Sequence, residues 1–128
     1  MTSDIAVLIV RVVRGEAPWQ SLRDSGVTIS VTADSVSVIA PEALAVEATA
    51  CDVAQGWLRY SHDAPALAAW SRFILSASVL FDLRFREEDD DEQALLESLW
   101  DVTFGEAPTR EMDTVARRIL LRCGNVRV

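Results

Sequence analysis

"VTISVTADSVSVIAP", residues 27–41, decides the fold class, because it is the one stretch in which apolar and polar residues alternate. Alternation with a period of two places the two kinds of side chain on opposite faces of an extended chain. A turn at Ala33 and Asp34 brings the two apolar rows onto one face, pairing Val31 with Val36 and Ile29 with Val38. A longer loop is the alternative connection, because alanine disfavours the positive φ of a tight hairpin turn. Pro41 ends the second strand. The stretch therefore predicts a β-hairpin over about residues 27–40.

The chain before the hairpin has helical spacing. Apolar residues recur every three or four positions over residues 5–13, Ser3 is placed to cap the helix start, and Gly15 to end it. Residues 17–26, "APWQSLRDSG", indicate a short helical turn between Pro18 and a glycine.

From residue 42 onward the pattern predicts four helices. The first has one apolar face from Val46 to Tyr60, and the second, over residues 64–82, is apolar on two sides, which makes it the central helix. The third and fourth show apolar stripes that end near Gly105 and Cys123. The expected fold is α+β and mostly helical, with one β-hairpin packed through its Val/Ile face on a bundle of about five helices.

Length and charge limit the classes of function. A chain of 128 residues fits a single globular domain over residues 1–128, with about two-thirds of its surface buried on folding. All twelve basic residues are arginine, and twenty acidic residues give a net charge of −8. This charge repels nucleic-acid backbones and attracts a basic protein partner. Nucleic-acid binding is therefore not expected.

The apolar segments favour a cytoplasmic protein without a membrane span. No basic region precedes the apolar run near the N-terminus, so it does not resemble a signal peptide. The apolar stretch over residues 65–81 is too short for a span and carries Arg72 near its centre. In such a protein, Cys51 and Cys123 are expected to be reduced, buried thiols, and they could pair only if the fold brings them together.

The acidic run "EEDDDE", Glu87 to Glu92, is the most unusual local feature. It lacks the glycine and the ligand spacing of an EF-hand loop, so a calcium site is not expected. Acidic residues are favourable at a helix start, and one aspartate can serve as the N-cap. One or two acids would meet that need, however. We therefore expect a hydrated, mobile acidic loop that leads into a helix and contributes to a surface for a basic partner, with these candidate residues: Glu87, Glu88, Asp89, Asp90, Asp91 and Glu92.

The tryptophans and Arg72 complete the list of residues with a predicted role. Three tryptophans fall on apolar stripes and are expected in the core, namely Trp57, Trp70 and Trp100. Trp19 is expected to be partly exposed, and it is the candidate anchor of an interface. Arg72, if buried, needs an acidic partner, which Glu97 or Asp101 could supply.

No residue set has the spacing of a catalytic, cofactor or metal site. His62 is the only histidine and is expected in an exposed loop, while the two cysteines provide too few ligands for zinc. No Gly-rich phosphate loop and no GxSxG elbow is present. The sequence therefore predicts no cofactor, no metal and no enzymatic activity.

Residues 52–106 resemble a family of small, acidic, uncharacterised bacterial proteins of the toxin-immunity type. The matching pattern is an A-x-G-x-L helix, a W-x-x-F-I-L helix and an acidic loop that leads to L-L-x-x-L-W-D-x-x-F-G. The resemblance implies a small acidic domain without an active site. It implies nothing for the first helix or the hairpin.

Two hypotheses of function follow. The first is a non-enzymatic protein-binding module, specifically an immunity-type inhibitor that covers a basic site of a bacterial toxin with acidic side chains. The second is a small-molecule-binding or enzymatic domain with a pocket between the hairpin and the helices. A deep polar pocket that holds both Arg72 and His62 would favour the second hypothesis.

Overall fold

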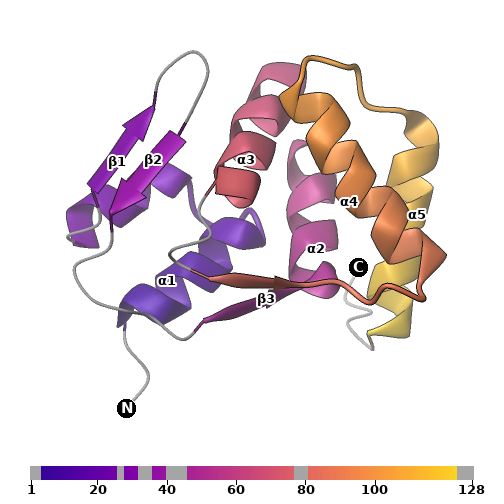
Figure 1. The fold of residues 1–128 in the computed structure, drawn as a ribbon, viewed down its shortest axis with the longest axis horizontal. Coiled ribbons are helices and arrows are strands. Elements are labelled where there is room, and N and C mark those ends of the chain that lie inside the picture. Colours follow the sequence, from indigo (N-terminus) through magenta and orange to yellow (C-terminus); the bar gives the residue numbers. More distant parts are fainter. Residues whose placement is uncertain (1–3, 26–27, 32–35, 40–45, 77–80, 124–128) are drawn as a thin grey trace.

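A computed structural model describes residues 4–25, 28–31, 36–39, 46–76 and 81–123. Helices dominate the chain, and short strands lie between them (Figure 1). The helices are α1 (Asp4–Val13), the 3-10 helix η1 (Trp19–Ser25), α2 (Ala50–Tyr60), α3 (Ala64–Ser76), α4 (Asp90–Thr103) and α5 (Arg110–Arg122). The strands are β1 (Thr28–Val31), β2 (Val36–Ile39), β3 (Glu47–Thr49) and β4 (Asp82–Arg84). This α+β, mostly helical class is the one that the sequence predicts.

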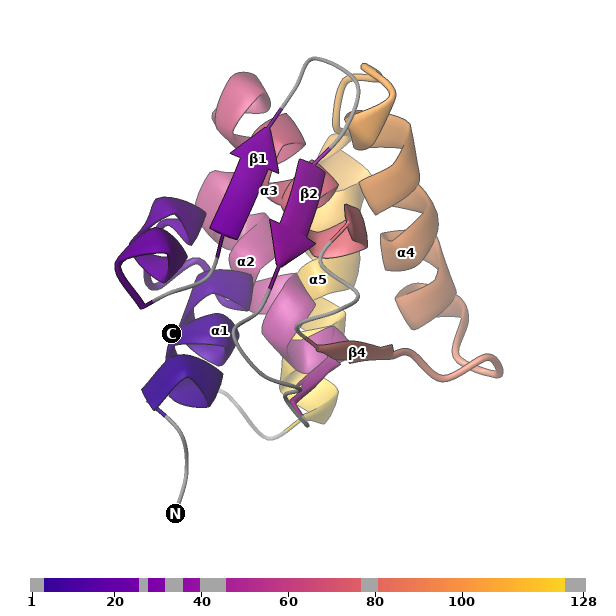
Figure 2. The same ribbon diagram turned by 60° about the vertical axis from the view of Figure 1, so that its left-hand side comes forward.

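The predicted hairpin is confirmed in its position and its register. β1 and β2 pair antiparallel, with Val31 opposite Val36 and Ile29 opposite Val38. The hairpin stands beside α3, with β2 next to that helix (Figure 2). The expected turn at Ala33 and Asp34 and the expected strand end at Pro41 lie outside the described residues, and so do the side chains of the expected Val/Ile face.

The helix expected from Val46 onward begins later than predicted. Residues 47–49 form β3, and α2 starts at Ala50. The physical reason is a capping box: the Thr49 hydroxyl accepts a hydrogen bond from the Asp52 amide, and the Asp52 carboxylate accepts one from the Thr49 amide at 3.0 Å. Val46 and Ala48 are buried with the spacing of two that a strand has, and Val46 also stands four positions before the buried Ala50, as on a helical face.

The central helix is also shorter than the predicted residues 64–82. α3 ends at Ser76, and residues 82–84 form β4, which runs parallel to β3. The pairs are Glu47 with Asp82, Ala48 with Leu83, and Thr49 with Arg84. A parallel pair needs a long connection, which here contains α2 and α3. Such pairing is not visible in local periodicity, which explains the wrong prediction.

The buried side chains form one cluster centred on α2 and α3. Trp57 and Trp70 are buried as predicted, and each satisfies its indole N–H: Trp57 donates to Asp113 Oδ1 at 3.1 Å, and Trp70 donates to the Val13 carbonyl at 3.2 Å. Gly56 lies where α2 meets the end of α1, and a Cβ there would collide with the Val13 carbonyl and the Trp70 ring. A close helix contact therefore requires glycine at this position.

The two cysteines are not free thiols. Cys51 at the start of α2 and Cys123 at the end of α5 form a disulfide, with their Cα atoms 6.4 Å apart. The prediction of reduced thiols is wrong, because α5 lies along α2 and brings together two residues that are 72 positions apart. In the part of the chain that the structure describes, no helix is long and apolar enough to cross a membrane.

Candidate functional site

The acidic run is divided between a helix start and the solvent. Asp89 is the N-cap of α4, and its carboxylate accepts a hydrogen bond from the Glu92 amide at 3.1 Å. Asp90, Asp91 and Glu92 form the first turn of the helix. The expectation that one aspartate caps the helix is confirmed. The loop is shorter than predicted, because Asp90, Asp91 and Glu92 already belong to α4.

Glu92 is buried, with 4% of its surface exposed. Its carboxylate accepts hydrogen bonds from the backbone N–H of Arg86 at 2.9 Å and from the Arg86 Nε at 2.8 Å. These two contacts hold the segment after β4 against the start of α4. A buried carboxylate with a charged partner is a structural group, so Glu92 is not available to a protein partner.

Asp91 and Asp89 connect the start of α4 to the end of α5. Arg118 donates to Asp91 at 2.9 and 3.2 Å, and Arg122 donates to Asp91 at 2.6 Å. Arg122 also donates to both carboxylate oxygens of Asp89 at 2.9 Å, and Arg86 reaches Asp89 at 3.1 Å. We call this set the acid–arginine cluster: Asp89, Asp91, Glu92, Arg86, Arg118 and Arg122.

The cluster changes the acidity of its aspartates. Hydrogen bonds from Arg118 and then Arg122 lower the pKa of Asp91 to about 2 from its ordinary 3.8. For Asp89, desolvation acts to raise the pKa, but the Glu92 amide and the charges of Arg122 and Arg86 lower it overall. Both groups are therefore held in the ionised form, as ion-pair partners require.

The other acidic residues of the run remain exposed. Glu87, Glu88 and Asp90 are exposed, and no described residue forms an ion pair with them. Of the six candidate residues, these three have carboxylates without an ion-pair partner among the described residues, although the charge of Glu88 helps to raise the pKa of Arg86. The description of the whole run as a hydrated acidic loop is thus wrong for Asp89, Asp91 and Glu92, because arginines of α5 and of the preceding segment neutralise them.

Trp19, the predicted interface anchor, is half-buried. Its ring stacks on Phe73 of α3 with a centroid distance of 6.4 Å, and the Arg23 guanidinium lies over it at 5.3 Å. These contacts attach η1 to the central helix. The expectation that Trp19 is partly exposed is confirmed, and its role as an interface anchor stays a prediction.

Trp100 is the exposed tryptophan instead. The sequence predicts it in the core, yet 47% of its surface is exposed. Its neighbour Phe104 is 77% exposed. Their rings stack on each other with centroids 6.1 Å apart. The buried face of α4 consists of Glu92, Leu95, Leu99 and Val102. Trp100 follows Leu99 by one residue, which turns it about 100° away from the core.

Two carboxylates flank this aromatic pair. Glu97 and Asp101 are exposed and, with Trp100 and Phe104, have the spacing i, i+3, i+4 and i+7 that places residues on one helical face. We call this set the outer face of α4: Glu97, Trp100, Asp101 and Phe104. It combines exposed aromatic surface with negative charge, and the described residues make no ion pair with either carboxylate.

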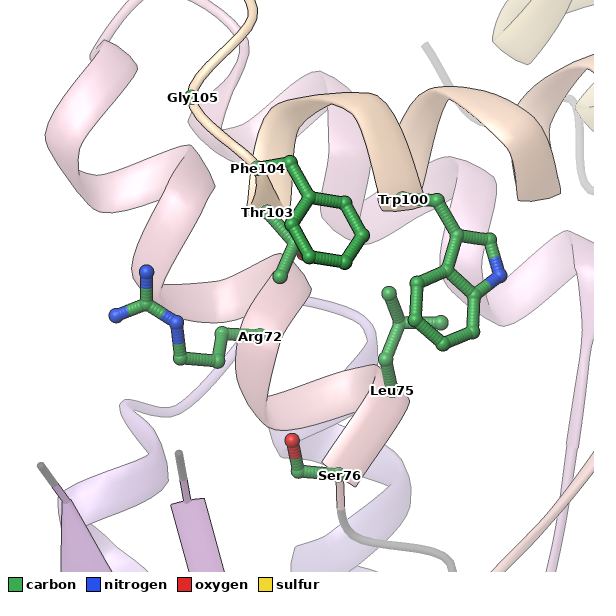
Figure 3. Close-up of a pocket in the computed structure, with 7 residues that line it drawn as sticks. All are labelled: Arg72, Leu75, Ser76, Trp100, Thr103, Phe104 and Gly105. Atoms are coloured by element: carbon green, nitrogen blue, oxygen red, sulfur yellow. The ribbon is translucent and has the colours of Figure 1, made fainter. Parts of the chain in front are cut away.

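A pocket of about 520 Å³ adjoins this face, between α3 and α4 (Figure 3). Arg72, Leu75 and Ser76 of α3 form one side, and the other side comes from the end of α4: Trp100, Thr103, Phe104 and Gly105. Arg72 is half-buried in the pocket wall. Neither Glu97 nor Asp101 forms the expected ion pair with it, since no described carboxylate lies within ion-pair distance.

His62 takes no part in this pocket. It is exposed in the turn between α2 and α3, at the opposite end of α3 from Arg72. Within the described ranges, no group of His, Cys, Asp and Glu side chains is arranged to hold a metal ion.

Comparison with protein-family models, with curated proteins and with solved structures finds no match to this chain.

Proposed function

We propose that this protein is a non-enzymatic protein-binding module and that the outer face of α4 is its binding surface. The observation that carries the proposal is the stacked and exposed pair Trp100–Phe104. Large aromatic side chains are enriched among the residues that dominate binding free energy. Two of them side by side in water expose apolar surface that a partner would cover.

The charges around the aromatic pair favour a basic partner. Glu97 and Asp101 lie on the same face as the rings, and Glu87, Glu88 and Asp90 are exposed at the other end of the helix. The net charge of −8 has the same sign. Such a field speeds the association of a positively charged protein and disfavours acidic ones. Aromatic anchors with acidic neighbours are thus suited to a basic protein surface.

An immunity-type inhibitor of a basic bacterial toxin is the specific form of this proposal. The resemblance of residues 52–106 to small acidic immunity proteins supports it, and an inhibitor of this kind needs only a complementary surface. As to location, the Cys51–Cys123 disulfide favours an oxidising compartment over the cytoplasm expected from the sequence.

The alternative, a small-molecule-binding or enzymatic domain, has weaker support. The pocket between α3 and α4 holds Arg72, but His62 lies at the other end of α3. No described histidine, cysteine or carboxylate lines the pocket. An enzymatic reaction in this pocket would need a general acid or base from outside its described lining.

The test is a comparison of two sets of substitutions at exposed apolar residues. Wild type, Trp100→Ala/Phe104→Ala and the control Leu121→Ala are each immobilised and exposed to a lysate of the source organism. Leu121 is 59% exposed and lies on α5, so its substitution removes apolar surface away from α4. Circular dichroism checks that each variant is folded.

We expect a basic protein to be retained by wild type and by Leu121→Ala and lost with the double variant. Calorimetry with the purified partner should then show at least about 2 kcal/mol less binding free energy for the double variant. A double variant that binds this partner as tightly as wild type would contradict the proposal.

A further inference from the structure

We propose that the pocket between α3 and α4 accepts an apolar side chain with an adjacent carboxylate, presented by the protein partner to Arg72. This inference rests on the proposed protein-binding function. The partner surface is then basic except for one carboxylate, which lies opposite Arg72.

Arg72 is the first reason. Arg59, Arg110 and Arg117 also form no ion pair with a described residue, but they are exposed. Arg72 differs because it is half-buried at a pocket wall. An exposed guanidinium is satisfied by water, whereas one partly withdrawn from water gains more from a charged acceptor. The planar guanidinium fits a carboxylate with two parallel hydrogen bonds.

The rest of the pocket provides an apolar wall and a second polar group. Leu75, Trp100 and Phe104 provide the apolar lining of the pocket, and Ser76 is its α3 residue with a hydroxyl. The Arg72 guanidinium lies on the far side of the Phe104 ring from Leu75 and Trp100 (Figure 3). Thr103 is less available, because its hydroxyl already donates to the Leu99 carbonyl at 2.7 Å. A volume of about 520 Å³ is large enough for a side chain with its adjoining carboxylate.

The charges in and near the pocket favour an occupant of mixed character. Arg72 in the pocket wall attracts a carboxylate, while Glu97 and Asp101, exposed on α4 outside the pocket lining, disfavour the approach of a simple anion. A group that gains from both sides needs an apolar body against the rings and a single carboxylate that reaches Arg72. A partner segment of this kind can bind in only one orientation across the groove.

A matched pair of small probes tests the chemistry. N-acetyl-L-phenylalanine carries an aromatic side chain and an adjacent carboxylate, and N-acetyl-L-phenylalanine amide differs only in lacking the charge. Binding is followed by NMR through the indole N–H of Trp100 in wild type, Arg72→Gln, Arg72→Lys and the control Arg117→Gln. The indole and amide spectra also show whether each variant keeps its fold.

We expect the acid to bind wild type about fivefold more tightly than the amide, the difference that one charge-assisted contact at a partly exposed site provides. Arg72→Gln should remove this preference, Arg72→Lys should keep part of it, and Arg117→Gln should keep all of it. Equal binding of acid and amide to wild type, no binding of either, or an unchanged preference in Arg72→Gln would overturn the inference.

The protein partner separates this inference from the proposed function. If Trp100→Ala/Phe104→Ala abolishes partner binding while Arg72→Gln leaves it unchanged, the proposed surface stands and the carboxylate inference fails. If the double variant binds the partner like wild type, the proposed function itself fails. Loss of binding in both variants supports both.

Discussion

Asp91, in the first turn of α4, accepts a hydrogen bond from Arg122, at the end of α5, at 2.6 Å. The start of one helix is thereby attached to the end of the next. The same carboxylate also binds Arg118, so one acidic side chain holds two arginines. Part of the acidic run is therefore a helix-to-helix connection, and only the remaining part faces the solvent.

Two neighbouring aspartates should differ in their effect on stability. Asp91→Asn should lower the free energy of unfolding by about 1 to 2 kcal/mol, because it weakens a network of charge-assisted hydrogen bonds. Asp90→Asn is the matched control, since Asp90 lies in the same helical turn but is exposed. Its effect should stay below about 0.5 kcal/mol. Urea unfolding of both variants measures the difference, and equal effects would show that the network contributes nothing.

The cluster should make stability depend on pH in the acidic range. The pKa of Asp91 is about 2 in the folded protein and ordinarily 3.8, so the unfolded chain takes up this proton more readily. The stabilisation is complete above about pH 5 and is lost as the pH falls through the ordinary pKa of 3.8 to the folded pKa of about 2. Asp91→Asn should flatten this part of the profile. Thermal unfolding at pH 6, 4 and 3 measures it, and parallel profiles would refute the assignment.

Reduction of the disulfide should destabilise the protein substantially. The bond closes a loop between residues 72 positions apart, and a loop of this length constrains the unfolded chain by roughly 4 kcal/mol. Urea unfolding with and without a thiol reductant, together with Cys51→Ala/Cys123→Ala, measures the effect. Reductant should leave the double variant unchanged. Two free thiols in the natively purified protein would instead support the reduced state expected from the sequence.

The exposed acidic residues should affect the rate of association and leave stability unchanged. Replacing Glu87, Glu88 and Asp90 with their amides should change the free energy of unfolding by less than about 0.5 kcal/mol. Association with the basic partner should slow by about threefold at low salt and by little at high salt, because salt screens charges at a rim. Stopped-flow measurements at two ionic strengths provide the comparison. An unchanged rate at low salt would make these residues a solvated connector only.

The hairpin could be predicted from the sequence because its information is local. The alternating Val and Ile residues indicate both the strands and their register, and the observed pairing of Ile29 with Val38 follows from them. The parallel pair β3–β4 could not be predicted in this way. Its strands have three residues each, and Val46, buried just before β3 and four positions from the buried Ala50, makes the helical spacing of α2 seem to begin before the strand.

The candidate site was predicted only in part, since its contacts join distant segments. The acidic start of α4 and the basic end of α5 were both visible in the sequence, and a short connection between antiparallel helices brings such ends together. That signal could have revealed the ion pairs of Asp91. The exposure of Trp100 is harder to foresee, because an aromatic residue one position from the buried Leu99 falls at the border of the apolar stripe.

The most direct test of the proposed binding surface is chemical-shift mapping of the labelled protein with its purified partner. If the outer face of α4 is the surface, the largest changes will fall on residues 97–105, including the Trp100 indole N–H, and on Arg72 and Ser76 across the pocket. Changes centred on Trp19 and η1, or on the exposed side of α5 around Leu121, with residues 97–105 unaffected, would contradict it.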